Sequence, residues 1–256
     1  MMKKLKIGLG AVLLLAGSSF MVSACHKTEK APANSQQEAA LPAAIPAPNG
    51  GSWTDAISVS PEGGFVMGNP KAPVSLVEYA SFTCPHCADF TQEGFPKLRD
   101  NYIAKGLVKL EFRNLVRDPF DIALTLLARC RGAETFFPIA DQLFQEQKPM
   151  FERIQNADKA DLQRVAGLPQ DQQMAEYIRL TGMNPFFGNR GLPTSAQNKC
   201  LTDQAAIKTL MDIRSIADKQ NVTGTPMFLI NGALQEVGIG SPIWDQLEPA
   251  LKAALQ

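Results

Sequence analysis

A pair of cysteines between an apolar run and a helical pattern constrains this chain more than any other feature. The run 73–82 (PVSLVEYASF) is nearly continuous in Val, Leu, Tyr and Phe, which predicts a buried strand. The motif C-P-H-C (84–87) comes next, and its proline suits the first position of a helix. After that helix, 107–115 (LVKLEFRNL) alternates as a second strand. This order predicts a β-α-β unit with a parallel strand pair.

The middle of the chain, 118–220, has helical periodicity and no convincing strand. Asp118 and Pro119 form a helix start signal, and the last helix of this segment is expected to turn Leu210 and Met211 inward. The segment separates two strand-containing parts of the chain. It therefore predicts an all-helical insertion within an α/β fold.

Strands are expected again near the C-terminus. Residues 226–230 and 233–239 flank Asn231-Gly232, which is the pattern of a β-hairpin. A helix that Ser241 caps is expected to close the chain. The first and last parts of the chain therefore predict one sheet layer, to which both contribute strands.

The first 24 residues have the pattern of an export signal, because Lys3, Lys4 and Lys6 precede the apolar run IGLGAVLLLAG. A retained membrane anchor is the alternative, but the run is short for a membrane span. The signal ends in VSAC, which resembles a lipobox with Cys25 as the acylated residue; ordinary cleavage would instead leave Cys25 as a free thiol. Residues 25–52 are rich in Ala, Pro and Gln and predict a flexible tether.

We therefore expect an exported lipoprotein on the periplasmic side, anchored in the lipid bilayer through Cys25. The balance of 25 Lys+Arg against 25 Asp+Glu gives no reason to expect a nucleic-acid partner. We expect the folded part to be a monomer.

A C-x-x-C motif serves as part of a zinc site, as a structural disulfide or as a redox couple. A structural zinc site requires four nitrogen or sulfur donors, and the motif supplies three with no fourth nearby in the sequence. We therefore expect no metal. A structural disulfide within four residues closes too short a loop to restrain much chain. The redox couple is the interpretation that the predicted helix supports.

The position of Cys84 at a predicted helix start favours redox chemistry. There, unpaired backbone amides and the helix dipole favour the thiolate over the thiol. Cys87 lies one turn further along and is placed to attack a mixed disulfide formed at Cys84. His86 can add a hydrogen bond or a positive charge. A lowered thiol pKa stabilises the reduced form, so the disulfide is expected to act as an oxidant, with no other cofactor.

The segment VEYASFTCPHC, the inserted helices and TGTP before the last hairpin resemble the DsbA family of thioredoxin-fold thiol–disulfide oxidoreductases. The resemblance covers about residues 60–256. It implies that Cys84 is the attacking cysteine and Cys87 the resolving cysteine, with Pro85 and His86 completing the catalytic motif. It also implies a thioredoxin-like fold around the predicted helical insertion.

The resemblance assigns two further parts of the site. Thr225-Pro226 is implied to be a cis-proline loop that faces the disulfide and pairs with an extended substrate segment. The best-known enzyme of the family has valine where this chain has Thr225. Glu78 stands six residues before Cys84, where DsbA-like proteins keep a buried acid that can carry the proton of Cys87. A partly hydrated, ion-paired glutamate without a catalytic role is the alternative.

Cys130 and Cys200 both lie in the predicted helical insertion. An exported protein meets oxidising conditions, so we predict a structural disulfide between them; two buried free thiols are the alternative. Such a bond would close a loop of roughly 70 residues and stabilise the fold by at most about 4 kcal/mol.

The leading hypothesis is an enzyme that oxidises cysteine pairs in exported proteins. Its expected partners are unfolded or partly folded proteins with free thiols, and a membrane partner that re-oxidises it. The alternatives are a reductase or isomerase of the same fold, a metallochaperone, and a binding lipoprotein with a vestigial redox site. The predicted segments are the export signal (1–24), the lipidated cysteine and tether (25–52), the thioredoxin-like domain in two parts (53–117 and 221–256) and the helical insertion (118–220).

Overall fold

The computed structural model describes residues 41–238 and 241–256, all within one unit of the chain. The predicted export signal (1–24), Cys25 and the first part of the predicted tether lie outside the described residues. Within the described ranges, none of the helices combines the length and the apolar composition that a bilayer-spanning helix requires.

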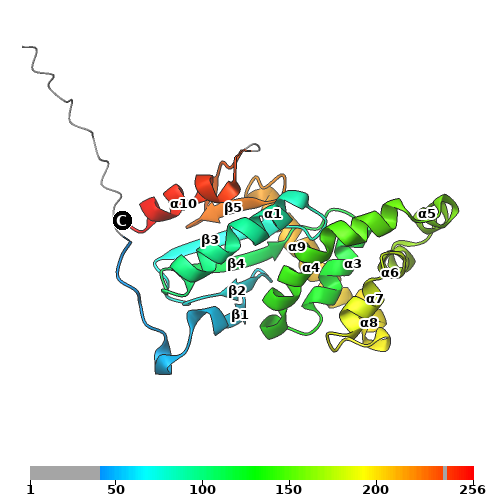
Figure 1. The fold of residues 1–256 in the computed structure, drawn as a ribbon, viewed down its shortest axis with the longest axis horizontal. Coiled ribbons are helices and arrows are strands. Elements are labelled where there is room, and N and C mark those ends of the chain that lie inside the picture. The colour runs from blue at the N-terminus through cyan, green and yellow to red at the C-terminus, as the bar shows by residue number, and fades with distance from the viewer. Residues whose placement is uncertain (1–40, 239–240) are drawn as a thin grey trace, which may run out of the picture. The chain divides into compact units, whose positions relative to one another are not determined.

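Six strands form one mixed sheet in the order β1-β2-β4-β3-β5-β6 (Figure 1). β3 and β4 are parallel, with Leu76 opposite Leu110, and each other neighbouring pair is antiparallel. The parallel pair confirms the predicted β-α-β unit. β3 is buried along nearly its whole length because it is central in the sheet. The strands are β1 (Ile57–Val59), β2 (Phe65–Met67), β3 (Val74–Ala80), β4 (Val108–Asn114), β5 (Met227–Ile230) and β6 (Ala233–Gln235).

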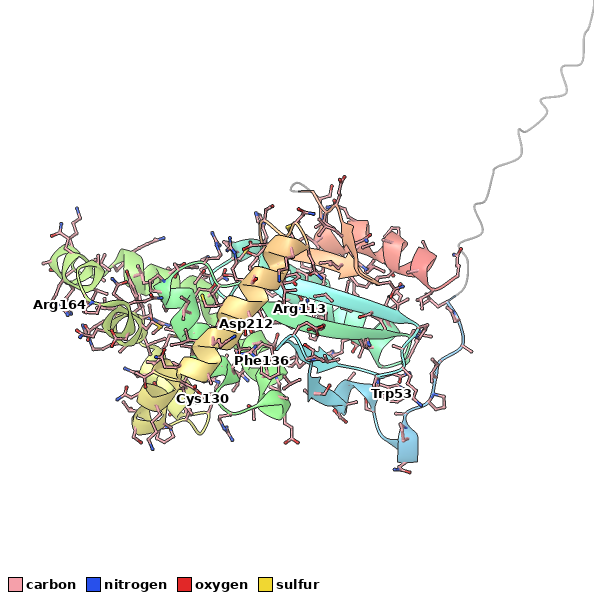
Figure 2. All side chains as sticks on the ribbon, turned by 180° about the vertical axis from the view of Figure 1, so that it is seen from behind. Trp53, Arg113, Cys130, Phe136, Arg164 and Asp212 are labelled. Atoms are coloured by element: carbon pink, nitrogen blue, oxygen red, sulfur yellow. A yellow bond between two sulfur atoms is a disulfide. The ribbon has the colours of Figure 1, made fainter. Side chains whose placement is uncertain are left out.

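Helices cover both faces of the sheet. α1 lies across β3 and β4 on the face seen in Figure 1, and α9 lies on the opposite face, seen in Figure 2. Between β4 and β5 the described chain contains only helices and their connections, as the sequence predicted. The α-helices are α1 (Pro85–Glu93), α2 (Phe95–Leu98), α3 (Pro119–Arg129), α4 (Ala133–Gln155), α5 (Lys159–Ala166), α6 (Gln170–Leu180), α7 (Met183–Gly188), α8 (Thr194–Leu201), α9 (Gln204–Lys219) and α10 (Ile243–Ala254). A π-helical turn occupies Arg99–Ile103, and 3-10 turns occupy Pro48–Gly50 and Trp53–Asp55.

A cluster of phenylalanines joins the helical segment to the sheet. Phe136 of α4 (labelled in Figure 2) stacks on Phe65 of β2 with ring centroids 4.1 Å apart, and it meets Phe112 of β4 at 5.3 Å. Further along α4, Phe144 lies 5.2 Å from Phe82, which follows β3. Ring pairs of this kind contribute roughly 0.5–1.5 kcal/mol beyond the apolar area that they bury. The inserted helices therefore share one core with the sheet.

The segment before Trp53 contacts the folded part, which corrects the end of the predicted tether at residue 52. The Trp53 indole donates a hydrogen bond to the Ile45 carbonyl oxygen at 2.7 Å. The Ile45 amide donates to the Lys105 carbonyl oxygen at 2.8 Å, and Leu41 packs against the core. The tether was predicted from its lack of large apolar side chains. Backbone groups make most of these contacts, so side-chain composition gave no sign of them. Contacts with the folded part are therefore present from residue 41, the first described residue.

Three smaller expectations were wrong. Met211, expected to face inward, is 44% exposed, since it lies about a quarter turn round α9 from the buried Leu210. The second hairpin strand ends at Gln235 instead of extending to residue 239. The N-cap of α10 is Pro242, without a side-chain capping bond, rather than Ser241.

Candidate active site

Cys84 and Cys87 lie at the junction between β3 and α1. Cys84 is the N-cap residue of α1 and Pro85 is its first residue, in the places that the sequence predicted. A proline fits there because the first amides of a helix have no acceptor within the helix. Cys84 is 3% exposed and Cys87 0%, and both are free thiols in this structure. The Cys84 thiol thus lies at the N-terminal end of α1. The Cys87 thiol lies one turn further along the helix and is fully buried.

The surroundings of Cys84 favour its thiolate. A hydrogen bond with the Cys87 thiol is the strongest influence, ahead of the opposing effect of burial. The Thr225 side chain and the backbone amides of Cys87 and His86 also stabilise the thiolate. Together these groups lower the pKa of Cys84 to about 5, although its thiol also donates to the Thr225 carbonyl oxygen at 3.1 Å. At neutral pH Cys84 is therefore a thiolate, the form that reacts with disulfides.

Cys87 and Glu78 hold their protons more tightly. Burial is the main reason that the pKa of Cys87 is raised well above its ordinary value, and the hydrogen bond and charge of Cys84 add to it. Burial also raises the pKa of Glu78 to about 8, with a further contribution from the charge of Cys84. Glu78 is 2% exposed, and its Oε1 has no hydrogen-bond partner among the described residues. The Glu78 carboxyl is therefore protonated at neutral pH.

The loop before β5 lies against Cys84. The Thr225–Pro226 peptide bond is cis, as the family resemblance implied. Thr225 contacts Cys84 through both its carbonyl oxygen and its side chain. The loop residue Thr225 therefore lies directly against the sulfur of Cys84.

His86 is the second residue of α1. Its side chain is exposed, and Nδ1 lies 3.5 Å from the Asp89 Oδ2 on the next turn of α1. Its backbone amide is among the groups that lower the pKa of Cys84. The position of the residue at the helix start therefore explains its effect on the thiolate.

Two buried polar side chains of the helical segment hold the turn that carries Cys84, and sequence analysis missed both. The Gln147 side-chain amide of α4 donates to the carbonyl oxygens of Phe82 (2.9 Å) and Cys84 (3.0 Å). Asp121 of α3 accepts from the Phe82 amide (3.0 Å) and the Ser81 hydroxyl (2.7 Å). Burial raises the pKa of Asp121 to about 7. Because both act across long sequence separations, no local pattern marks them.

Two clefts meet beside Cys84. One of about 470 Å³ lies between α1 and the start of α10, with Pro226 and Trp244 in its wall. The other, of about 480 Å³, includes Cys84 itself and the loop residues before Pro226. His86 and Thr225 border both clefts. The two clefts are therefore adjacent.

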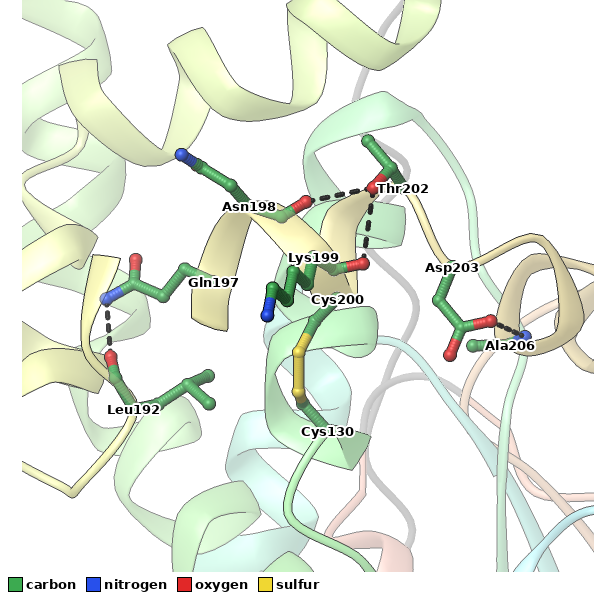
Figure 3. The surroundings of a disulfide bond; sticks show 9 residues. All are labelled: Cys130, Leu192, Gln197, Asn198, Lys199, Cys200, Thr202, Asp203 and Ala206. Carbon is green, nitrogen blue, oxygen red and sulfur yellow. Dashed lines mark hydrogen bonds between the residues drawn. A yellow bond between two sulfur atoms is a disulfide. The ribbon is translucent and has the colours of Figure 1, made fainter. Parts of the chain in front are cut away.

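Cys130 and Cys200 form a disulfide with Cα atoms 5.9 Å apart (Figure 3), which is the pairing that the sequence predicted. Cys130 is the C-cap residue of α3 and Cys200 belongs to α8. The bond spans a separation of 70 residues that contains α4 to α7. It therefore ties α3 to α8 across the helices that lie between them.

In the part of the chain that the structure describes, no group of three or more His, Cys, Asp or Glu side chains is arranged to hold a metal ion.

Comparisons with known proteins support the fold. The family model described as Thioredoxin matches residues 60–253. The crystal structure of a protein-disulfide isomerase from Novosphingobium aromaticivorans is 31% identical, covers 75% of this chain and 96% of that one, and has a TM-score of 0.68. The structure of Wolbachia pipientis α-DsbA1, at 22% identity, covers 77% of this chain and 93% of that one with a TM-score of 0.59, and it shares the fold.

A curated relative from Rickettsia felis, named as a protein-disulfide oxidoreductase, is 28% identical over 194 residues, which are 75% of this chain and 60% of that protein. This chain thus spans less than two thirds of the relative's length.

The match over most of the chain defines a protein of the thioredoxin fold, which confirms the fold class predicted from the sequence. The chain belongs to the thioredoxin family.

Proposed function

We propose that this protein is a thiol:disulfide oxidoreductase that donates its Cys84–Cys87 disulfide to cysteine pairs in other proteins. The observation that carries the proposal is the contrast between the two thiols: the pKa of Cys84 is lowered to about 5, whereas that of Cys87 is raised. Reduction of the disulfide leaves Cys84 as a stabilised thiolate. The reduced form is therefore favoured, which makes the disulfide an oxidant.

The reaction begins when a substrate thiolate attacks the Sγ of Cys84 in the oxidised protein. The bond between Cys84 and Cys87 breaks, a mixed disulfide forms at Cys84, and the electron pair leaves on Cys87. Cys87 takes a proton because its pKa is high, and the protonated carboxyl of Glu78 supplies it. A second substrate thiolate then attacks the substrate sulfur of the mixed disulfide. Cys84 leaves as its thiolate, so the substrate has lost two electrons and the protein has gained two.

The remaining parts of the site have supporting roles in this proposal. Thr225 and Pro226 form the loop that pairs with the reacting substrate segment. Pro85 and His86 set the helix start that stabilises the thiolate. The Cys130–Cys200 bond is structural.

The proposed setting rests on the sequence pattern and the family resemblance. The substrates are unfolded or partly folded exported proteins with free thiols, and a membrane partner re-oxidises the reduced enzyme. An acyl chain on Cys25 holds the monomeric protein at the periplasmic side of a membrane. The relatives named as a protein-disulfide oxidoreductase and as disulfide bond formation protein D support disulfide chemistry of this kind.

The direction of electron flow is tested by the redox equilibrium of the full chain in graded glutathione buffers. Free thiols at Cys84 and Cys87 are trapped by alkylation and counted by mass spectrometry. A disulfide donor is expected to have a potential well above the thioredoxin value of about −270 mV, toward about −120 mV. A potential near the thioredoxin value would make the protein a reductase.

Isomerisation is the second candidate, because the Novosphingobium protein with 31% identity is titled a protein-disulfide isomerase. Refolding of ribonuclease with scrambled disulfides separates the two activities. A donor oxidises reduced ribonuclease rapidly but restores little activity to the scrambled form. Rapid recovery of the scrambled form by the reduced protein would favour the isomerase.

A further inference from the structure

The two clefts that meet at Cys84 have opposite charge. The cleft between α1 and α10 has two carboxylates in its lining, Asp89 and Glu93, and within the described residues no lysine or arginine lines it. Asp89 and Glu93 are four residues apart on α1, so both side chains lie on one face of that helix. Both residues are exposed. We call this the acidic cleft.

The cleft on the other side of Thr225 is lined by two guanidinium groups, Arg117 and Arg214, and no described Asp or Glu lines it. Arg117 is exposed, and its Nη1 donates to the Thr83 carbonyl oxygen at 3.4 Å. Arg214 is also exposed, and its Nε lies 3.1 Å from the Asp218 carboxylate, which offsets part of its charge. We call this the basic cleft.

A bound substrate has little freedom in how it crosses these clefts. Its cysteine must reach the Sγ of Cys84, which lines the basic cleft. Cys84 contacts Thr225, and Thr225 borders both the acidic and the basic cleft. A segment extended along the loop rises about 3.3 Å per residue, so residues two or three positions from the cysteine lie in the clefts. The residues before and after the cysteine thus meet opposite charges.

We propose that the acidic and basic clefts select substrate cysteines flanked by a basic residue on one side and an acidic residue on the other, in one order along the chain. The occupant is a segment of an unfolded polypeptide. The inference rests on the proposed function and adds to it the charge pattern of the preferred substrate. Exposed charge pairs are weak singly, so the preference is expected to be a few-fold and to decrease with salt.

Two peptides of identical composition test the preference. Each has a single cysteine, and they have the sequences Lys-Lys-Gly-Cys-Gly-Glu-Glu and Glu-Glu-Gly-Cys-Gly-Lys-Lys with blocked ends. Each peptide reduces the oxidised full chain, and the rate of opening of the Cys84–Cys87 bond is followed by acid quenching and alkylation. The rates of the same peptides with oxidised glutathione correct for their different thiol reactivities. One order is expected to react about 3- to 10-fold faster at low salt, with the ratio approaching 1 near 1 M salt.

Variants at the clefts identify the source of the preference. Asp89→Asn with Glu93→Gln, and separately Arg117→Gln with Arg214→Gln, should each bring the ratio of the two rates closer to 1. Asp89→Lys and Glu93→Lys combined with Arg117→Glu and Arg214→Glu should reverse it. These side chains are exposed, so the substitutions are expected to leave the fold intact.

A matched control changes two exposed acids away from both clefts, Glu152→Gln with Asp171→Asn, and should keep the ratio of the unmodified protein. Equal corrected rates for the two peptides, or a ratio that the cleft variants do not alter, would overturn the inference while leaving disulfide donation in place. Failure of both peptides to open the disulfide would instead overturn the proposed function, and the inference with it.

Discussion

At the scale of single residues, three ionisable groups of β3 and the start of α1 have pKa values displaced in different directions. The pKa of Cys84 is lowered, whereas those of Cys87 and Glu78 are raised by burial. The difference follows from position: Cys84 caps α1, whereas Cys87 is buried in the first turn of α1 and Glu78 is buried in β3. At neutral pH the reactive thiolate therefore belongs to Cys84, while Cys87 and Glu78 keep their protons.

The reduced protein should show the ionisation of Cys84 as a rise in thiolate absorbance near 240 nm with a midpoint near pH 5. Because this pKa is depressed below the unfolded value of about 8.5, the thiolate stabilises the reduced fold fully above pH 8.5. That stabilisation is lost as the pH falls through about 5. Cys84→Ala should remove the transition, and a midpoint above pH 8 would contradict the lowered pKa.

Glu78→Gln should stabilise the protein at neutral pH. The folded pKa of Glu78 is about 8 and the unfolded value about 4.3, so the wild-type fold loses stability as the pH rises between these values. The glutamine variant lacks this loss and should gain on the order of 3 kcal/mol at pH 7. Urea unfolding from pH 4 to 8 measures the difference, with the exposed Glu93→Gln as control. A difference that does not grow with pH would show that Glu78 is ionised in the fold.

At the scale of elements, helices far away in sequence determine the geometry of the Cys84 turn. α3 supplies Asp121 and α4 supplies Gln147, and both bind backbone groups of the turn between β3 and α1. A buried carbonyl oxygen that lacks a hydrogen-bond donor lowers the stability of the fold. The inserted helices are therefore part of the site's support.

Gln147→Met keeps the size of the side chain but removes its donors. It should leave the Phe82 and Cys84 carbonyl oxygens without a partner and lower the free energy of unfolding by about 1–3 kcal/mol. The pH profile of Cys84 alkylation should also shift, because the turn positions the helix start. Gln145→Met, at an exposed site on the same helix, should change neither quantity. An unchanged alkylation profile for Gln147→Met would limit that residue to a purely structural role.

The strength of local pattern decided which elements sequence analysis could predict. The buried run of β3, the helix start at Cys84 and the Asn231-Gly232 turn are local signals, and the structure has all three. β1 and β2 were not predicted, because strands of three residues are too short to show an alternation. Met211 was wrongly expected to be buried. Periodicity alone locates the apolar face of a helix only to within about one residue, because it does not show what packs against that face. Gln147 and Asp121 act only through tertiary contacts.

At the scale of the whole described part of the chain, the sheet and the inserted helices share one core, and a disulfide links two of the inserted helices. The phenylalanine cluster joins α4 to β2 and β4, and the Cys130–Cys200 bond links α3 to α8. Composition and periodicity could predict the insertion, but not that its core would merge with that of the sheet. The merging requires side chains that meet only in three dimensions.

Replacement of both Cys130 and Cys200 by alanine should lower the free energy of unfolding by up to roughly 4 kcal/mol, because the unfolded chain regains the freedom of a long loop. Urea unfolding measures the loss, and reductant should cause a similar loss in a protein with Cys84→Ala and Cys87→Ala. The thiolate titration of Cys84 should be unchanged in the double alanine variant. No loss of stability would mean that packing alone holds α3 and α8 together.

The same bond has a consequence for how the protein matures. A newly synthesised chain carries Cys130 and Cys200 as thiols, so an oxidant has to join them before the form described here exists. Under the proposed activity, mature molecules of this protein are such oxidants, and each newly made chain is one of their substrates. Accumulation of mature protein would then be autocatalytic, with a lag where no finished molecule is present and a rate that grows with the number already made.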